Sequence, residues 1–362
     1  VVPKPHSSDL RPCLDLSTVN QFIPNESFKM EGIRTAKELL RNGDWMGKID
    51  IKGAYWQIPI AHKCRDLFRF KVENIHYRHV GLPMGVNVAP RLFSRVMKAI
   101  LAPLRRRGIR MVIYLDDILV IADTERKAAE HLAVVATRLV RLGWLLNWKK
   151  SVLQPAQTME FLGLLLDAAR MEIRLPSHRR DRIMRTLKEV WQGAAVSKRK
   201  LSSLVGSLNS AGEALANQRL YSQHLIQELR SKRGWDQRLA LGPKAKEECL
   251  AWIDLLDHWN GRCVVPPPYD LLLTTDASPF GWGAWAARSL ACQEEIWRTR
   301  GHFSSSEKQM HINVKELLTV SLALRAAPEL IRGRHILLRT DNTVCMAYLN
   351  GQGGRKQGLS CL

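Results

Sequence analysis

The sequence predicts a multidomain protein of mixed class, α+β in its first part and α/β in its last. Three observations indicate this. The 362 residues are enough for two or three domains. Short apolar strands alternate with helices in the first part, and amphipathic helices follow in the middle. Beyond the proline-rich segment 263–270, strands and a helix alternate again. We place the domain boundaries at 1–165, 166–230, 231–267 and 268–362.

Composition restricts the partners. The formal net charge of +21 suits a polyanion such as nucleic acid, with an anionic membrane surface as the weaker alternative. No apolar run reaches the roughly 18 residues that a membrane-spanning helix needs, so we expect no membrane insertion. The seven cysteines show no CxxC spacing, which predicts an intracellular setting, cytoplasmic or nuclear. The chain starts at Val1 without Met and stops abruptly, so we expect a fragment of a longer protein.

The elements of the first part follow from periodicity. Segment 46–60 has the alternating apolar and aromatic residues of a strand, and 89–108 has a helical apolar face of Phe93, Val96, Met97 and Ile100. We expect the Arg105–Arg107 triplet to be a solvated helix end suited to the helix dipole, with a dedicated phosphate site as the alternative. A helix is predicted for about 124–143, and EFLGLLLD (160–167) predicts a strand or hairpin.

The segment IRMVIYLDDILVIAD (109–123) places two carboxylates, Asp116 and Asp117, inside a strongly apolar stretch. A β-hairpin turn is one interpretation, although a tight turn prefers Asn-Gly or Asp-Gly and no glycine is near. Adjacent carboxylates repel each other, and burial raises that cost. The alternative is a divalent cation site that neutralises the pair.

Asp50 also interrupts an apolar strand, in KIDIKGAYWQIPI. One strand carboxylate beside a hairpin tip with two more would form a three-carboxylate cage. Oxygen ligands of this kind suit Mg²⁺. Two such ions could stabilise both the attacking and the leaving oxygen of an in-line phosphoryl displacement.

The ordered set of Asp50, the aromatic Tyr55, GLPMGVNVAPRLF (81–93), YLDD (114–117) and EFLG (160–163) resembles a reverse transcriptase over residues 1 to about 230. The resemblance implies a right-hand polymerase fold, with fingers and palm to about 165 and a helical thumb after it. It implies two Mg²⁺, or Mn²⁺, bridged by Asp50 and Asp116, with the Ile51 carbonyl as a ligand and Asp117 in support. Tyr55 resembles the steric gate against a ribonucleotide 2′-OH, with a packed strand aromatic as the alternative.

Further contacts are implied by the same resemblance. Those expected to hold the incoming dNTP are Lys4, Arg11, Met84, Gly85 and Lys150, with Lys149 an equally basic neighbour of the last. Those expected to hold the primer and the duplex are Phe161, Leu162, Gly163, Arg179, Arg182 and Arg185. Two positions depart from the family. Gly53 stands where an acid is common, and Met84 stands where retroviral enzymes carry Gln.

Three acids recur at element ends in the last part: Asp276 after LLLTT, Glu316 in a predicted helix (314–327), and Asp341 after HILLRT. They suggest a second Mg²⁺ site for phosphodiester chemistry. The alternatives are a near capping box of Asn313 with Glu316, and turns or helix caps at the two aspartates. The order TDAS, GWGAW, HINVKEL, RTDN resembles ribonuclease H.

Within that resemblance, GWGAW and HIN-x-x-EL look most like the tyrosine-recombinase-encoding (DIRS-like) retroelements, with LTR elements and pararetroviruses left open. The family uses a fourth acid and a His near its C-terminus. No Asp, Glu or His follows Asp341 here, so we expect a truncated domain and leave its nuclease activity uncertain.

Together these features predict an RNA-directed DNA polymerase of a retroelement. The expected partners are an RNA template, a DNA primer, RNA/DNA hybrid, dNTPs and other parts of a retroelement polyprotein. The alternative is a catalytically decayed remnant that only binds nucleic acid.

Overall fold

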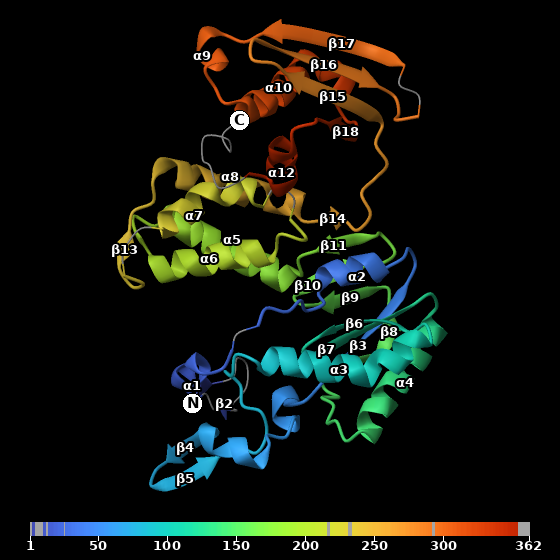
Figure 1. Ribbon diagram of the computed structural model, residues 1–362, viewed down its shortest axis with the longest axis vertical. Helices are drawn as coiled ribbons and strands as arrows, with labels where there is room; N and C mark the ends of the chain where they lie inside the picture. The colour runs from blue at the N-terminus through green and yellow to red at the C-terminus, as the bar shows by residue number, and fades with distance from the viewer. Residues whose placement is uncertain are drawn as a thin grey trace. The chain divides into compact units, whose positions relative to one another are not determined.

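The computed structural model describes residues 2–3, 10–11, 14–24, 26–215, 218–230, 234–291 and 294–353. The chain divides into two compact units, Val1–Pro176 and Ser177–Leu362. Both mix helices with strands, which confirms the predicted class (Figure 1). The four predicted parts are finer than this division, and their boundaries stay predictions. No described helix has both the length and the apolar character needed to cross a bilayer.

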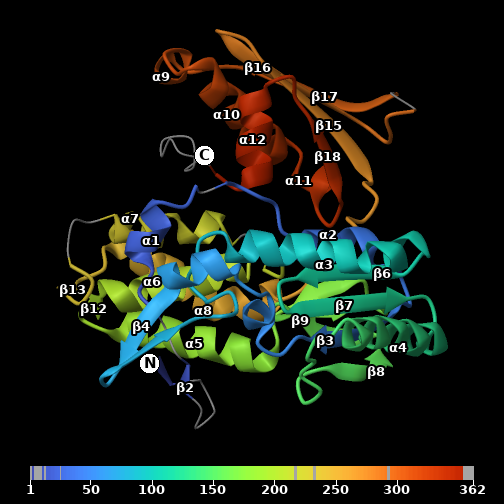
Figure 2. The ribbon, with the colours of Figure 1, turned by 60° about the horizontal axis from the view of Figure 1, so that its bottom comes forward.

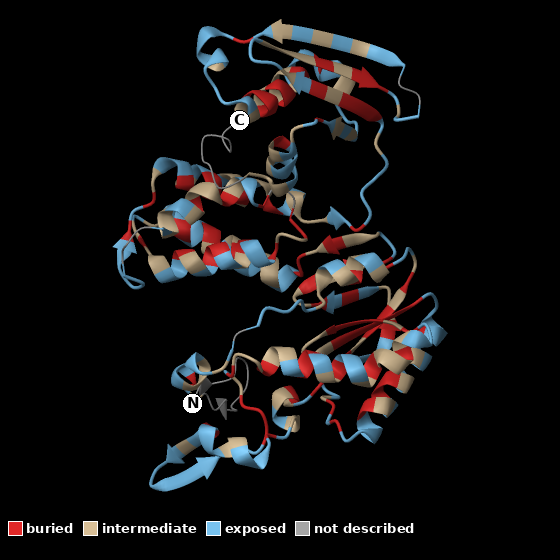
Figure 3. Ribbon diagram, in the orientation of Figure 1, coloured by how far each residue is buried: buried red, intermediate tan, exposed pale blue. Residues whose placement is uncertain are grey.

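A four-stranded antiparallel sheet forms the centre of the first unit. Its order is β6 (Arg110–Tyr114), β7 (Asp117–Ala122), β3 (Trp45–Asp50) and β8 (Val152–Ala156). Two helices, α3 (Ala89–Arg106) and α4 (Glu125–Arg141), cover one face of it (Figure 2). The helix face of the sheet is the main core of this unit, where Figure 3 shows the buried strands.

Strand alternation decides which side chains enter that core. The buried residues shared by the sheet and the helices include Ile49, Ile51, Ile118, Val120, Phe93, Met97, Leu132 and Val135. Because successive side chains of a strand point to opposite faces, Lys48, Asp50 and Asp117 lie on the face away from the helices. The sheet therefore presents its charged residues on one side only.

Both predicted helices of this unit are confirmed, with ends that differ by one or two residues. Thr124 caps α4, since its hydroxyl accepts a hydrogen bond from the Lys127 N–H at 3.3 Å. The expectation of a solvated Arg105 is wrong. Its guanidinium forms a bidentate ion pair with Glu31 and also donates to the Met111 carbonyl.

The predicted strand 46–60 is wrong beyond Asp50. Gly53 has φ 59°, in the left-handed region, and a 3₁₀ helix, η1 (Ala54–Gln57), follows it. A side chain at this position would be strained, because only glycine enters that region without cost. The family's acid would therefore be disfavoured at this position of the chain.

Apart from β3 and η1, the elements before α3 are short. They are β1 (Val2–Pro3), β2 (Leu10–Arg11), α1 (Ser17–Gln21), α2 (Ile33–Leu39), the 3₁₀ helix η2 (His62–Phe68), β4 (Arg69–Val72) and β5 (Ile75–Arg78). The β4–β5 hairpin extends from the body of this unit (Figure 1). Phe70 and Tyr77 stack across it on one face, whereas basic side chains occupy the other.

EFLGLLLD (160–167) forms a hairpin, which is one of the two structures predicted for this segment. Strands β9 (Thr158–Phe161), β10 (Leu164–Asp167) and β11 (Glu172–Arg174) pair antiparallel in sequence order. Leu162 and Gly163 form the two-residue turn with φ 51° and 72°. Two positive φ values are what a tight hairpin turn with the native twist requires.

The second unit begins with the predicted amphipathic helices. They are α5 (Ser177–Gln192), α6 (Lys198–Ser210), the 3₁₀ helix η3 (Leu220–Ser222), α7 (Gln223–Leu229) and α8 (Pro243–Trp259), with the short strands β12 (Val196–Ser197) and β13 (Arg238–Leu239). Buried Leu187, Leu204, Leu225 and Trp252 come from all four α-helices. The helical prediction for this region is therefore confirmed.

A second sheet follows β14 (Arg262–Cys263) and the proline-rich segment. Its order is β17 (Glu295–His302), β16 (Gly281–Ala287), β15 (Leu271–Ala277) and β18 (Ile336–Arg339), with β18 parallel to β15 and the other pairs antiparallel. The helices are α9 (Ser305–Lys308), α10 (Ile312–Ala326), α11 (Pro328–Ile331) and α12 (Thr343–Gly351). Helix α10 packs against β15 and β16, and α12 packs against α10 (Figure 1).

Candidate active sites

Asp50 and Asp117 face each other across two neighbouring strands. They are direct partners in the antiparallel register of β3 and β7, so both project from the sheet face opposite α3 and α4. Asp116 precedes Asp117 at the tip of the β6–β7 hairpin and is exposed. The Ile51 N–H donates to the Asp116 carbonyl at 2.9 Å, which ties the tip to the end of β3. The three predicted acids therefore belong to one small region.

The hairpin and the acidic cluster are one feature, so the two interpretations of YLDD do not compete. Tyr114 pairs with Asp117 across a two-residue turn. Leu115 has φ 50° there, in the region that favours glycine. A leucine in this conformation costs free energy, of order 1–3 kcal/mol, and persists only where the surrounding structure imposes it.

The acids of this cluster are electrostatically strained. Burial raises the pKa of Asp50, a hydrogen bond from the Asn147 side chain lowers it, and the charge of Asp116 raises it further, with a net increase. Burial likewise raises the pKa of Asp117, Lys48 opposes this, and Asp116 and Asp50 add to the increase. Lys48 and Lys150 are the cations whose charges favour both ionised carboxylates.

Sequence reasoning missed two residues that hold Asp50. Asn147 donates its backbone N–H to the Asp50 carbonyl at 2.8 Å, in addition to the side-chain contact. The Ser151 hydroxyl accepts from the Asp50 N–H at 3.0 Å and donates to the Asn147 carbonyl at 2.9 Å. Both lie in NWKKS, beside the predicted Lys150. Their polar side chains, on either side of the predicted phosphate-binding Lys150, are the sequence feature that could have indicated them.

Tyr55 lies in η1, half-buried, with its ring edge-on to Phe93 at 5.6 Å. Burial raises the pKa of its hydroxyl, and the charges of Asp116 and Tyr114 raise it further. The Tyr55 hydroxyl therefore lies close enough to Asp116 to be affected by its charge, and the ring contacts Phe93.

The other predicted dNTP contacts are placed as follows. Lys150 is exposed, and its charge acts on Asp50 and Asp117. Met84 is half-buried in a turn with Gly85, whose φ is 99° and whose carbonyl accepts from the Asn20 side chain at 2.9 Å. Lys4 and the side chain of Arg11 lie outside the described residues.

The predicted primer and duplex contacts differ in character. Phe161 is fully buried, so of the predicted contacts on the β9–β10 hairpin only the Leu162–Gly163 turn is accessible. Arg182 and Arg185 are exposed on α5, whereas Arg179 donates to the Ser210 hydroxyl at 2.5 Å. On α6, Arg199 pairs with Asp236 and Lys200 with Glu189. The basic surface of these helices is therefore partly neutralised within the protein.

The second predicted triad is gathered closely. Asp276 on β15, Glu316 on α10 and Asp341 after β18 each place a carboxylate oxygen within 4.8 Å of the others. Among the described residues, this is the one group of three or more potential metal ligands that meets so closely. The acids at Asp50, Asp116 and Asp117 are spaced more widely.

Glu316 is the buried member of this triad, 3% exposed. Burial raises the pKa of Glu316, and the charges of Asp341 and Asp276 raise it further. Thr340 donates its hydroxyl to the Glu316 carboxylate at 3.5 Å. Three carboxylates with so few opposing cations form a site that a divalent cation would stabilise.

The capping roles that were the alternative prediction for the three acids are filled by other residues. The side chain that caps α10 is His311, which accepts from the Asn313 N–H at 3.2 Å, so Asn313 and Glu316 form no capping box. Asn313 instead accepts from the Asn342 side chain at 3.0 Å. Asn342, and not Asp341, caps α12 through the Cys345 N–H. Glu316 and Asp341 therefore do not cap these two helices.

A positioning residue lies next to Glu316. Lys315 is buried, and its ammonium donates to the carbonyls of Pro279 at 3.0 Å and Lys308 at 2.8 Å. Phe303 lies beneath it, with the ammonium 5.9 Å from the ring centroid. This lysine joins α10 to the β15–β16 turn that follows Asp276.

Comparison with known proteins identifies both regions. Residues 2–166 match the family described as reverse transcriptase (RNA-dependent DNA polymerase). Residues 267–358 match the RNase H-like domain found in reverse transcriptase. The chain therefore contains a reverse transcriptase domain and a ribonuclease H-like domain, which confirms the two main resemblances.

Curated relatives are viral polyproteins. The enzymatic polyprotein of Cauliflower mosaic virus (strain NY8153) is 25% identical over 359 residues, covering 96% of this chain and 50% of that protein. The enzymatic polyprotein of Figwort mosaic virus (strain DxS) is 25% identical over 353 residues, covering 96% and 51%. The chain thus spans about half the length of these relatives.

Solved structures support the fold. Foamy viral protease-reverse transcriptase in complex with RNA/DNA hybrid has a TM-score of 0.62 at 20% identity, covering 99% of this chain and 47% of that one. Its complex with dsDNA has a TM-score of 0.63 at 22% identity, covering 97% and 70%. At such identities the similarity concerns the fold alone.

Proposed function

We propose that the chain is the catalytic part of an RNA-directed DNA polymerase, which extends a DNA primer on an RNA template with dNTPs. The observation that carries this is the pairing of Asp50 with Asp117, beside Asp116, on the sheet face opposite α3 and α4 in a reverse transcriptase domain. The nucleic acids in the foamy viral structures, which are RNA/DNA hybrid and dsDNA, support the same substrate class here. The remainder of the relatives' length suggests further polyprotein partners.

The donor set fits Mg²⁺, or Mn²⁺, in the polymerase site. Asp50 and Asp116 would hold the ions, with the Ile51 carbonyl as a further ligand and Asp117 in support. When bound, the ions would lower the pKa of the primer 3′-OH and neutralise charge on the departing pyrophosphate. Asn147 and Ser151 hold Asp50, and Lys150 places a cation at the same face. The Tyr55 ring would exclude a 2′-OH.

The Asp276, Glu316 and Asp341 cluster fits the same metal chemistry by its spacing. We propose that this domain acts on the RNA strand of an RNA/DNA hybrid. The proposed limits of the parts are 1–165 for fingers and palm, 166–230 for the thumb, 231–267 for the connection and 268–362 for this domain. The motifs GWGAW and HIN-x-x-EL support a DIRS-like origin, although the relatives named above are plant viruses.

The polymerase test is primer extension on poly-rA/oligo-dT with Mg²⁺. Asp116→Asn should abolish extension while duplex affinity changes less than about twofold, because most binding free energy comes from basic contacts. Asp123→Asn is the matched control, since it removes a carboxylate charge from an exposed residue directly after β7. Equal loss of binding and extension in Asp116→Asn would contradict the assignment.

The same assay distinguishes the alternative of a decayed, binding-only remnant. A remnant would still bind the duplex and yet extend no primer even as the unaltered chain. For the second domain, any cleavage of labelled RNA in a hybrid by the unaltered chain should disappear with Asp276→Asn and persist with Asp254→Asn, an exposed carboxylate on α8. A free-cysteine pattern at Cys64, Cys249, Cys263 and Cys345 is consistent with the proposed intracellular location.

A further inference from the structure

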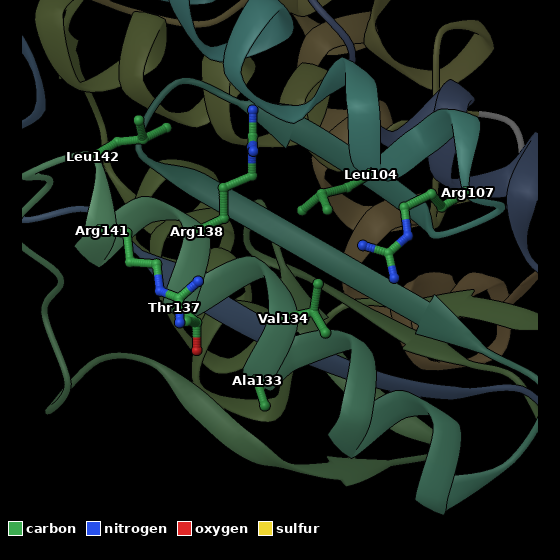
Figure 4. Close-up of a pocket in the computed structure, with 8 residues that line it drawn as sticks. All are labelled: Leu104, Arg107, Ala133, Val134, Thr137, Arg138, Arg141 and Leu142. Carbon is green, nitrogen blue, oxygen red and sulfur yellow. The ribbon is translucent and has the colours of Figure 1, made fainter.

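Helices α3 and α4 form a groove on the face of the first sheet that carries no acid. Its volume is about 420 Å³, and it is lined by Leu104, Arg107, Ala133, Val134, Thr137, Arg138, Arg141 and Leu142 (Figure 4). Ligand pockets commonly span about 300–1,000 Å³. Because Asp50 and Asp117 project from the opposite face, the polymerase chemistry does not use this groove.

The groove combines an apolar floor with an arginine rim. Leu104 and Val134 lie between the guanidinium groups of Arg107 and Arg141 in Figure 4, and Leu142 is 52% exposed at one end. Arg138 is tied down, since its Nε donates to the Ile100 carbonyl at 2.6 Å and so joins α4 to α3.

Two of the arginines have no partner. Among the residues that the structure describes, no carboxylate pairs with Arg107 or Arg141, and no acid lines the groove. Both arginines lie at helix C-termini, Arg107 as the C-cap of α3 and Arg141 as the last residue of α4, where they also complement the helix dipoles. That role does not explain why the two helix ends place both arginines beside the same groove, with aliphatic side chains between them.

We propose that this groove binds an acidic amphipathic helix of a partner protein. Carboxylates on such a helix match the planar forks of Arg107 and Arg141, and its aliphatic face matches Leu104, Val134 and Leu142. A nucleic acid fits less well. No aromatic side chain lines the groove to stack on bases, and phosphates would leave the aliphatic floor uncovered.

The test measures binding of a fluorescent synthetic peptide to the full chain at physiological ionic strength. The peptide has about 14 residues, with leucine at every third or fourth position among glutamates. Its controls are a peptide of the same composition with the leucine spacing scrambled, a lysine-for-glutamate peptide, and 14-nucleotide oligo-dT. The proposal expects saturable binding of the first peptide alone among the three peptides.

Three variants locate the site. The double variant Arg107→Glu/Arg141→Glu should weaken peptide binding at least tenfold. Arg182→Glu/Arg185→Glu on α5 makes the same change in net charge on exposed residues and should weaken it less than threefold. Leu142→Ser should weaken peptide binding without changing oligo-dT binding. Primer extension should be unaffected by the groove variants, which also shows that they fold.

Several results would contradict the proposal that the groove binds an acidic helix. Equal weakening by the two double variants, or equal binding of the scrambled peptide, would mean general attraction of polyanions to a basic protein. Oligo-dT binding that is lost with Arg107→Glu/Arg141→Glu and kept with Arg182→Glu/Arg185→Glu would make the groove a nucleic-acid site. Absence of saturable peptide binding would also overturn the proposal.

Discussion

At the scale of single residues, the polymerase site depends on contacts between distant parts of the chain. Ser151 lies 101 positions after Asp50 and yet accepts its backbone N–H. Asn147 contacts the same residue through its backbone and its side chain. Groups that orient a catalytic carboxylate are expected to affect rate more than substrate affinity.

Asn147→Ala should therefore lower kcat for primer extension by about 10–100-fold, in line with the loss of other groups that orient metal ligands. The KM for dNTP should change less than threefold, because the contacts of Asn147 seen in the structure are with Asp50. Steady-state kinetics with one varied dNTP measures both constants. Trp148→Ala changes the exposed neighbour and should leave kcat within about twofold. A fall in kcat that is as large for Trp148→Ala would mean general damage to this segment.

Tyr55 offers a test of sugar discrimination. Tyr55→Ala should raise the ratio of kcat/KM for rNTP over dNTP by at least tenfold, because it removes the ring that would meet a 2′-OH. Tyr55→Phe keeps the ring against Phe93 and should keep the ratio near that of the parent chain. If neither variant moves the ratio, Tyr55 serves only to pack.

At the scale of elements, helix α7 is held by an acid from another helix. Glu248 on α8 is buried, and its carboxylate accepts the backbone N–H groups of His224 and Leu225, each at 2.9 Å. These are donors of the first turn of α7, which have no partner within the helix. The carboxylate also matches the positive end of the helix dipole.

Glu248→Ala should lower the free energy of unfolding of the second unit by about 1–3 kcal/mol, since buried N–H groups lose their acceptor. Amide exchange at His224 and Leu225 should accelerate before exchange in α5. Glu247→Ala, at the exposed neighbouring position of α8, is the control and should change stability by less than about 0.5 kcal/mol. Unchanged exchange at α7 in Glu248→Ala would show that other groups hold the helix.

At the scale of the whole molecule, the net charge of +21 is the dominant property. Not all of the basic side chains are equally available to a nucleic acid, because some of them are paired with acids. Arg199 and Lys200 are paired with acids, whereas Arg182 and Arg185 are exposed. A phosphate backbone is therefore expected to meet α5 more than α6.

Binding to RNA/DNA duplex should fall with salt, with a slope of log K against log salt near −4 to −5 if about five phosphates are neutralised. Arg182→Gln/Arg185→Gln should make this slope less steep by about 2. Arg199→Gln/Lys200→Gln should change it by less than 1. Fluorescence anisotropy across a salt series measures the slopes. A flat dependence for the parent chain would dismiss the basic surface as merely solvated.

Several properties of this protein were determined by sequence alone. Helices α3, α4, α5 and α10 were predicted because a 3.6-residue apolar period is written locally in the chain. Asp50, Asp116 and Asp117 were found because charges that interrupt apolar strands are costly and therefore conspicuous. Asp276, Glu316 and Asp341 were found because they recur at the ends of predicted elements and within ordered motifs. Both matched domains followed from the order of short motifs.

Only the tertiary structure decided what surrounds these acids. The end of β3 at Asp50 depends on the left-handed conformation of Gly53, which periodicity does not reveal. The pairing of Arg105 with Glu31, 74 positions away, replaced a solvated helix end. The contact of Asn147 with Asp50 and the groove between α3 and α4 also join residues far apart in sequence. Such contacts depend on strand register and helix packing, which no local pattern encodes.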